Sequence, residues 1–332
     1  MSFKITLQPS NHSFYCEAKE TILQAALRSG LNLDYSCNSG SCGDCKVMVN
    51  FGQSIVLQNA DFPLTDAQKS QGYVLLCSIG ARSDMEICAV EAKSTNDIPF
   101  QKISVKINKI LPMADDYYEL QLRTPRSNTL RFLAGQSIQL SGENGTLRAS
   151  VASCPCNGMN LQLHLDGRER NPLTQALIRD SQVRADVRLE GPYGEFTLDD
   201  DSTRPIVLVA FAVGFAPIKS VIEHAIALEK EQSVTLFWIM PTSRQHYQYN
   251  YCRSWEDAFD GFVYIPLFLE GDTADISAFQ KIVQEVLART PIESEIDLYL
   301  AGPVEMVQVF TAEFQQRRTP VERIRALLSN ES

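Results

Sequence analysis

Apolar and polar residues follow a strand-like pattern along the first part of the chain. Short alternating or apolar segments, each typical of a β-strand, lie at residues 3–8, 13–17, 46–49 and 86–90. Between the second and the third of these, residues 21–29 carry apolar side chains at helical spacing, and Gly30 ends the helix. We therefore predict a small α+β domain over residues 1–93.

A denser series of short strands follows a polar linker at residues 92–100. The predicted strands cover residues 103–111, 117–122, 136–140, 150–153, 161–165, 183–190 and 196–198. A helix begins at Pro172, a residue suited to a first helical turn, and runs to about Arg179. Many short strands separated by turn residues predict an antiparallel β-barrel over residues 101–201.

The pattern changes again after Pro205. Residues 206–210 form a continuous apolar run, as expected for a strand that is covered on both faces. Further strands are predicted at 234–239, 262–268 and 298–300, and helices at 217–229, 276–287 and from 304 onward. Strands that alternate with helices indicate a parallel sheet, so residues 204–332 are predicted to form an α/β domain of the nucleotide-binding kind.

The composition is that of a globular protein with a real core, since 44% of the 332 residues are hydrophobic and 21% are charged. A formal net charge of −10 argues against nucleic acid as a partner and favours a protein partner with a basic docking face. The longest apolar run, residues 205–218, is too short to span a bilayer. The first residues are typical of a strand and not of a signal peptide. We expect no transmembrane segment and a cytoplasmic location.

The strongest chemical signal is a group of cysteines in the first domain. Cys37, Cys42 and Cys45, followed further on by Cys77, have the C-x4-C-x2-C…C spacing of plant-type [2Fe–2S] ligands. Soft thiolates select iron–sulfur clusters or zinc, but a structural zinc site usually has two close ligand pairs in the sequence. Nine cysteines are an odd number without a secretion signal, which disfavours a set of disulfides. The four cysteines are therefore predicted to hold a [2Fe–2S] cluster.

Four other cysteines are given no ligand role. Cys16 and Cys88 lie inside predicted strands and are expected to be small core residues. Cys154 and Cys156 flank a proline in a predicted turn. They are not expected to form a redox pair, because C-x-C lacks the usual two-residue spacer.

The order of strands, helix and cysteine loop resembles the β-grasp fold of plant-type ferredoxins. Over nearly its whole length the chain resembles the ferredoxin–NADP reductase superfamily with a fused ferredoxin, in particular the reductase components of bacterial oxygenases and the CDP-6-deoxyglucoseen reductases. Besides the cysteine loop, residues 191–196, 214–218 and 301–303 carry this resemblance. It implies that NAD(P)H gives a hydride to FAD, and that single electrons then reach the cluster and a partner oxygenase or dehydrase.

The family's flavin motif, Arg-x-Tyr-Ser-x-Ala-Ser, aligns with residues 147–153. Ser150, the residue expected to hydrogen-bond the edge of the flavin ring, is kept. The stacking tyrosine is replaced by Ala149 and the phosphate-pairing arginine by Leu147. Arg148 lies one position away, and on a strand its side chain points to the opposite face unless a bulge intervenes.

Other flavin and nucleotide contacts are implied by the resemblance. Thr174 matches a phosphate-binding position at a helix start, although ordinary helix capping by Asn171 explains the same residues. Gly194 is kept in the motif that ends the barrel. Residues 243–244 are candidates for holding a ribose 2′-phosphate, with a plain polar loop as the alternative.

The nucleotide turn departs from the family as well. Only Gly214 remains of the family's Gly-Gly-Thr-Gly, and Phe211 and Val213 add bulk where the pyrophosphate would approach. Ala301 replaces the family's cysteine, and the aromatic residue that usually ends the chain over the flavin is missing.

Two functional hypotheses follow. In the first, the chain is a working iron–sulfur flavoprotein reductase that uses NAD(P)H. In the alternative, it is a degenerate reductase that no longer binds FAD or NAD(P)H productively and acts as a [2Fe–2S] electron relay or scaffold. The departures at separate chemical positions favour the alternative, whereas the retained Ser150, Thr174, Gly194 and Gly214 favour the working enzyme.

Overall fold

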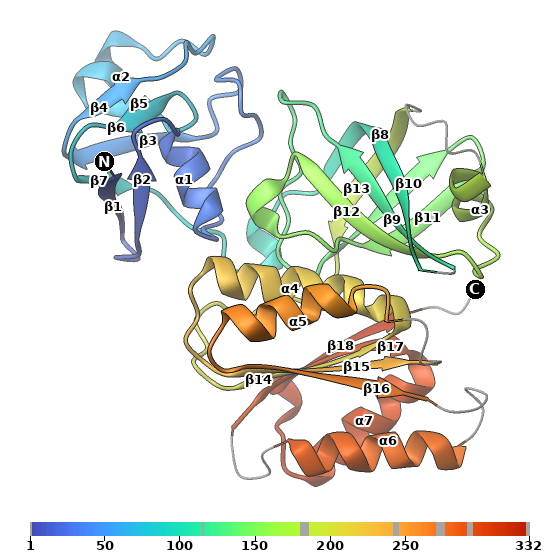
Figure 1. Cartoon of the computed structure of the whole chain (residues 1–332). Coiled ribbons are helices and arrows are strands. Elements are labelled where there is room, and N and C mark those ends of the chain that lie inside the picture. Colours follow the sequence, from blue (N-terminus) through green and yellow to red (C-terminus); the bar gives the residue numbers. More distant parts are fainter. Residues whose placement is uncertain are drawn as a thin grey trace.

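A computed structural model of the chain describes residues 2–114, 116–179, 186–241, 246–269, 276–290 and 295–329. The candidate ribose-phosphate residues 243–244 lie outside this described part. Figure 1 shows three units, with the N-terminal unit beside a curled antiparallel sheet and a layered α/β unit next to both. This is the mixed α+β and α/β architecture that the sequence predicts.

The N-terminal unit has a five-stranded mixed sheet with the strand order β2-β1-β7-β3-β5 and a separate two-stranded sheet of β4 and β6. Its elements are β1 (Ser2–Gln8), β2 (Ser13–Glu17), α1 (Ile22–Arg28), β3 (Lys46–Phe51), β4 (Ser54–Val56), α2 (Asp66–Ser70), β5 (Tyr73–Leu75), β6 (Ile79–Ala81) and β7 (Met85–Cys88). Helix α1 begins with a capping box between Thr21 and Gln24 and packs its apolar face into the core of the sheet. Cys16 is buried as predicted. The prediction for Cys88 is wrong, because Ile87 takes the buried face and leaves Cys88 exposed.

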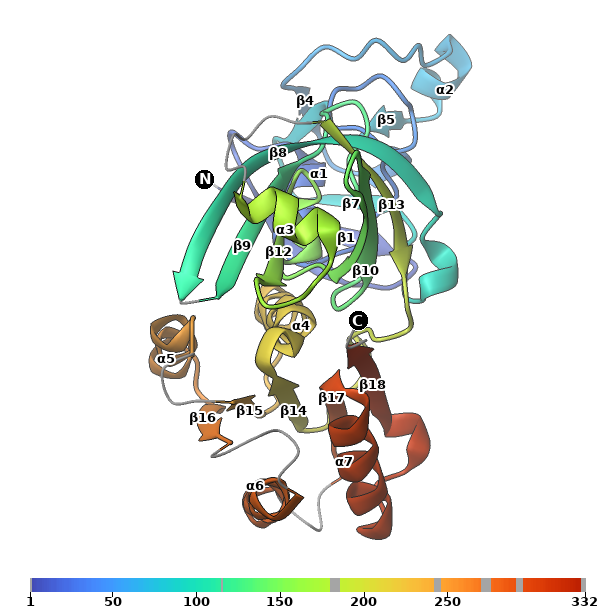
Figure 2. The ribbon, with the colours of Figure 1, turned by 90° about the vertical axis from the view of Figure 1, so that its right-hand side faces the viewer.

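The second unit is a six-stranded antiparallel sheet with the order β11-β10-β13-β8-β9-β12. Its strands are β8 (Gln101–Ala114), β9 (Tyr117–Arg123), β10 (Ser137–Gly142), β11 (Gly145–Ser150), β12 (Asn160–Asp166) and β13 (Asp186–Tyr193). Figure 2 shows the strong curl of this sheet, and a bridge between Val151 and Leu163 joins its two ends. Helix α3 (Pro172–Arg179) has the predicted bounds and packs Leu173 and Leu177 into the barrel core.

Two predicted barrel strands lie elsewhere or do not form. The strand predicted at 150–153 is instead β11, because β10 and β11 pair up to Gly142 and Gly145 in a tight hairpin. Residues 196–198 are not a strand. Their two apolar residues, Phe196 and Leu198, are instead buried in the core shared by the barrel and the α/β unit.

The third unit is a parallel sheet with the order β16-β15-β14-β17-β18. Its elements are β14 (Ile206–Phe211), α4 (Phe215–Ala227), β15 (Val234–Met240), α5 (Tyr249–Ala258), β16 (Phe262–Phe268), α6 (Ile276–Arg289), β17 (Asp297–Pro303), α7 (Val304–Gln316) and β18 (Ile324–Ser329). Helices α4 and α5 cover the face toward the barrel, and α6 and α7 cover the other face (Figure 1). Within the described ranges, we find no helix with the length and apolar character needed to cross a membrane.

Candidate functional site

The four predicted cluster ligands lie together as two pairs of thiols. The Sγ atoms of Cys45 and Cys77 are 3.3 Å apart, and the side chains of Cys37 and Cys42 are hydrogen-bonded to each other. Two thiolates bound to one tetrahedral metal at about 2.3 Å lie roughly 3.8 Å from each other, close to the first spacing. Among the described residues, no group of three or more His, Cys, Asp or Glu converges on a single ion. Two pairs suit two irons with two thiolates each better than one zinc ion.

The backbone of the cysteine loop takes conformations that need glycine. Gly40 and Gly43 have φ angles of 75° and 85°, in the left-handed region. A Cβ at Gly43 would also lie 2.5 Å from the Phe62 ring, so the loop has no room for a larger residue. The curled backbone directs the amide of Asp44 at the Sγ of Cys42, 3.5 Å away. Hydrogen bonds of this kind are one of the factors that set the potential of a cluster.

Each thiol pair contains one sulfur that ionises readily. Burial would raise the pKa of Cys37, but hydrogen bonds from the Ser39 backbone amide and from Cys42 outweigh it and lower this pKa to about 6. A hydrogen bond from Cys45 lowers the pKa of Cys77 to about 7. The pKa of Cys42 is raised, chiefly by burial, and that of Cys45 is raised by its hydrogen bond to Cys77. Since thiolates are the metal-binding form, one ligand of each pair is available near neutral pH.

The cysteine loop is hydrogen-bonded to the barrel. The backbone amide of Asn38 donates to the carbonyl of Arg126 (2.8 Å), and the amide of Thr129 donates to the carbonyl of Ser36 (2.8 Å). These bonds flank Cys37 on both sides. They hold the loop at a fixed position beside the barrel, which suits electron transfer between groups carried by the two units.

The predicted flavin residues Arg148 and Ser150 lie on β11, and Gly194 directly follows β13. Leu147 is buried in the barrel core, and β11 pairs with β10 in unbroken register, so no bulge turns Arg148 to the same face. The Arg148 guanidinium instead stacks on the Tyr193 ring at 4.4 Å, and its Nε donates to the Ser137 hydroxyl (3.4 Å). Ser150 is half-buried and lies opposite Ser137 in the strand pair.

Open space lies next to these residues. Gly194 has a φ of 94°, and a Cβ built on it would meet no atom within 4 Å. The exposed Gly194 follows Tyr193, so a flat ligand has free access to this edge of the barrel. Ser150 and Gly194 therefore fit a flavin that is held at its ring edge, without the aromatic stack that the family's tyrosine provides.

The start of α3 is closed by its own cap. The Asn171 side-chain oxygen accepts from the backbone amides of Leu173 (3.0 Å) and Thr174 (3.1 Å). Thr174 is fully buried, and its hydroxyl lies 3.5 Å from the same oxygen. The helix amides that would hold a phosphate are thus already hydrogen-bonded, as helix capping requires. The phosphate contact of Thr174 stays a prediction.

The nucleotide crevice at the carboxyl ends of the parallel strands is narrow. A cavity of about 10 Å³ remains there, lined by residues that include Phe211 and Gly302. A Cβ on Gly302 would lie 2.8 Å from the Cβ of Phe211, and one on Gly214 would lie 2.3 Å from the carbonyl oxygen of Ala301. Gly214 is therefore required by the close approach of β17, whatever its role toward a pyrophosphate. Phe211 occupies the space where the dinucleotide would approach the strand ends.

Comparison with known proteins agrees with this arrangement. Residues 5–82 match the model of the 2Fe-2S iron-sulfur cluster binding domain, and residues 208–311 match that of the oxidoreductase NAD-binding domain. The CDP-6-deoxy-L-threo-D-glycero-4-hexulose-3-dehydrase reductase of Yersinia pestis is 30% identical over 95% of this chain and 94% of its own length. A terephthalate 1,2-dioxygenase reductase component of Comamonas sp. is 29% identical over 80% of this chain and 78% of its own.

Solved structures show the same fold. The Amycolatopsis cytochrome P450 reductase GcoB has a TM-score of 0.60 and 24% identity, with 99% of this chain and 100% of that one covered. The ferredoxin reductase in carbazole 1,9a-dioxygenase has a TM-score of 0.59 and 21% identity, with 99% and 98% covered.

Fold and site together define an iron–sulfur reductase. The chain belongs to the ferredoxin–NADP reductase superfamily, in the branch that carries a fused N-terminal [2Fe–2S] ferredoxin domain. Membership of this branch supports a [2Fe–2S] cluster, FAD and NAD(P)H as cofactors, and electron transfer to an acceptor protein as the function.

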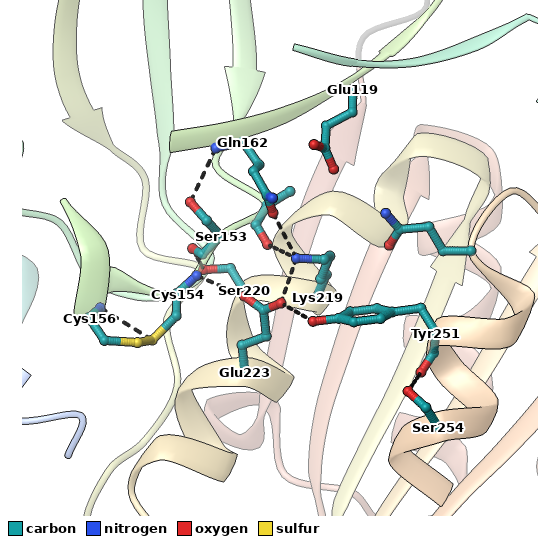
Figure 3. Close-up of polar contacts among 12 residues, drawn as sticks. Glu119, Ser153, Cys154, Cys156, Gln162, Lys219, Ser220, Glu223, Tyr251 and Ser254 are labelled. Atoms are coloured by element: carbon teal, nitrogen blue, oxygen red, sulfur yellow. Dashed lines mark hydrogen bonds and ion pairs between the residues drawn. A yellow bond between two sulfur atoms is a disulfide. The ribbon is translucent and has the colours of Figure 1, made fainter. Parts of the chain in front are cut away.

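The structure also joins residues that the sequence leaves apart. Figure 3 shows Lys219 and Glu223 of α4 in contact with residues of the barrel. The spacing of four residues between Lys219 and Glu223 within a helix could have predicted their ion pair. The contacts of Lys219 with Ala152 and Gln162 of the barrel could not be predicted, because those residues are distant in the sequence.

The sulfurs of Cys154 and Cys156 form a disulfide, contrary to the prediction, because the short helical turn η2 (Pro155–Asn157) brings their Cα atoms within 5.2 Å.

Proposed function

We propose that the chain is the reductase component of a two-component system, and that its electrons leave through a cluster held by Cys37, Cys42, Cys45 and Cys77. One observation carries this proposal: Cys77 and the three cysteines of a loop that is hydrogen-bonded to the barrel form two thiol pairs, on the same chain as an NAD-binding domain. We assign the cluster to residues 1–93, FAD to 101–201 and NAD(P)H to 204–332.

The nicotinamide moves two electrons at once and the cluster takes one, and the flavin supplies the chemistry that connects them. The chain's own residues bind and orient these groups. Ser150 offers a hydroxyl to the flavin ring edge, and Gly194 leaves that edge unobstructed. Arg148 offers a cation near the flavin phosphates, and Gly214 allows β17 to close against the nucleotide turn. Thr174 is the weakest of these assignments, because its hydroxyl is buried under the helix cap.

We place the electron acceptor among dehydrases of nucleotide-linked deoxysugar synthesis. The support is the full-length similarity to the Yersinia pestis relative, whose name is that of a dehydrase reductase. An oxygenase component is the second candidate, because the Comamonas relative is nearly as similar over a shorter stretch. The net charge of −10 suits an acceptor with a basic docking face in either case.

The proposal is tested by steady-state reduction of two artificial electron acceptors, ferricyanide and cytochrome c. Ferricyanide takes electrons directly from a reduced flavin, whereas cytochrome c reports electrons that pass through the cluster. In a Cys77→Ser variant we expect NAD(P)H-driven reduction of cytochrome c to fall to near the background and reduction of ferricyanide to persist. Equal cytochrome c reduction by both proteins would remove the cluster from the electron path. Adding a purified dehydrase or oxygenase component with its substrate then identifies the acceptor by the extra NAD(P)H consumed.

A further inference from the structure

A polar cavity lies between the barrel and the α/β unit. Its volume is about 590 Å³, within the roughly 300–1,000 Å³ that small-molecule sites occupy. Strands β9 and β12 form one wall, and α4 and the residues at the start of α5 form the other (Figure 3). The residues assigned above to the cluster, the flavin and the nucleotide do not line it.

One wall of this cavity is built around a buried lysine. Lys219 is 3% exposed, and its Nζ donates to the carbonyl of Ala152 (3.3 Å), to Oε1 of Gln162 (3.0 Å) and to Oε1 of Glu223 (2.5 Å). The Tyr251 hydroxyl donates to the same Glu223 oxygen (2.9 Å). Three acceptors use all three ammonium protons. The wall is therefore rigid, and it offers a ligand no free positive charge.

The groups left free in the cavity are hydrogen-bond acceptors. Glu119 is 8% exposed, and Oε1 of its carboxylate accepts from Nε2 of Gln121 (2.6 Å). Across the described ranges, no cation forms an ion pair with Glu119. The side-chain oxygen of Gln248 is buried and has no partner. Buried carboxylates and amides are normally paired, so these two groups call for a ligand that brings donors and a positive charge.

The remaining lining selects further for hydroxyl groups. Amide side chains dominate it, and each can donate to and accept from a hydroxyl; those not yet named are Asn108, Asn157 and Asn160. The ring of Tyr251 is partly exposed, and an aromatic face adds attraction for a cation. A divalent metal ion is a poor match, because it needs several oxygen ligands and Glu119 is the one carboxylate here without a charged partner among the described residues.

We propose that this cavity binds a small primary amine that carries hydroxyl groups and has the size of an amino sugar. The ammonium group lies between the carboxylate of Glu119 and the side-chain oxygen of Gln248, and the hydroxyls contact the amides. Because Glu119 comes from the barrel and Gln248 from the α/β unit, the bound ligand also ties the two units together. The proposal does not depend on the redox assignment.

Titration calorimetry and thermal unfolding of the full chain test this inference with three probes. D-glucosamine has both features, D-glucose lacks the amine and n-butylamine lacks the hydroxyls. We expect glucosamine to bind with a dissociation constant of about 1 mM or lower and to raise the melting temperature, and each of the other probes to bind at least about tenfold more weakly. Magnesium ion, tested alone, should give neither signal.

Two variants and one control complete the test. Glu119→Gln keeps the shape and removes the charge, and Gln248→Ala removes the free acceptor from the other wall. Each should weaken glucosamine binding by about tenfold or more, as expected for the loss of a charged or buried hydrogen bond. Glu143→Gln, an exposed carboxylate on the same unit, should leave it unchanged. Absence of binding at about 10 mM glucosamine, or equal binding by wild type and both cavity variants, would overturn the proposal.

Discussion

Replacing Lys219 by methionine should weaken the contact between the barrel and the α/β unit and so lower the free energy of unfolding. The substitution keeps the side-chain length but removes the ammonium group from three acceptors, one of which is the Glu223 carboxylate at 2.5 Å. Breaking a buried ion pair by removing one partner costs about 3–5 kcal/mol, because the other charge stays buried. Glu223 keeps hydrogen bonds from the Tyr251 hydroxyl and the Cys154 amide, so we expect the lower end, about 3 kcal/mol.

Urea unfolding followed by tryptophan fluorescence measures this loss. Both tryptophans, Trp238 and Trp255, lie in the core next to α4, so their fluorescence reports the unfolding of the α/β unit, to which Lys219 belongs. Lys102→Met is the matched control. Its ammonium pairs with Glu190 at 3.1 Å but is largely exposed, and pairs of that kind contribute about 0–1 kcal/mol.

A double variant separates the buried charge from the lost packing. In Lys219→Met with Glu223→Leu no uncompensated charge remains, so part of the stability, about 1–2 kcal/mol, should return relative to the single variant. If Lys219→Met costs no more than Lys102→Met, the buried network does not hold the two units together and the reasoning fails. If the double variant is less stable than the single one, the buried charge is not the cause of the loss.

Three further predictions concern the barrel core, the nucleotide crevice and pH. Ala149 packs against the barrel core on the same face of β11 as Leu147, so Ala149→Tyr should overfill that core and lower the free energy of unfolding by about 1–3 kcal/mol, as measured by urea unfolding; an unchanged free energy would place the side chain outside the core. Phe211→Gly should open the nucleotide crevice and lower the KM for NAD(P)H, with the exposed Phe51→Gly as an unaffected control. Burial and the nearby Lys219 charge lower the pKa of His164 to about 3, below the usual 6.5 of an unfolded chain. Between these values the unfolded state binds the extra proton, so stability should fall by about 2 kcal/mol from pH 7 to pH 5, and less steeply in His164→Gln; equal slopes would refute this.

The sequence was most informative where local chemistry decides the structure. The cysteine loop could be predicted because its ligand spacing and its two glycines are local features. Helix α3 was predicted with the observed bounds because Asn171 and Pro172 mark its start. Residues 196–198 were misjudged, because an apolar run has the same pattern whether it pairs as a strand or fills a junction between two units.

The interdomain features depend on contacts between distant segments. Lys219, Gln162 and Ala152 come from three separate elements, and only the packing of α4 on the barrel brings them together. The free carboxylate of Glu119 could not be recognised either, because its strand shows an ordinary alternation of polar and apolar residues. Two hydrogen bonds to Asn171 cap the start of α3, as one of the two interpretations that the sequence left equal requires, and the phosphate contact of Thr174 stays a prediction.

One chain should carry electrons from NAD(P)H to a [2Fe–2S] cluster. An anaerobic titration of the purified, FAD-supplemented protein with NADH or NADPH, followed by visible absorption and by electron paramagnetic resonance, measures this transfer. We expect a bound iron–sulfur chromophore that bleaches and gives the rhombic signal of a reduced [2Fe–2S] centre. A protein without iron and sulfide, or a cluster that dithionite reduces but neither nicotinamide nucleotide does, would contradict it.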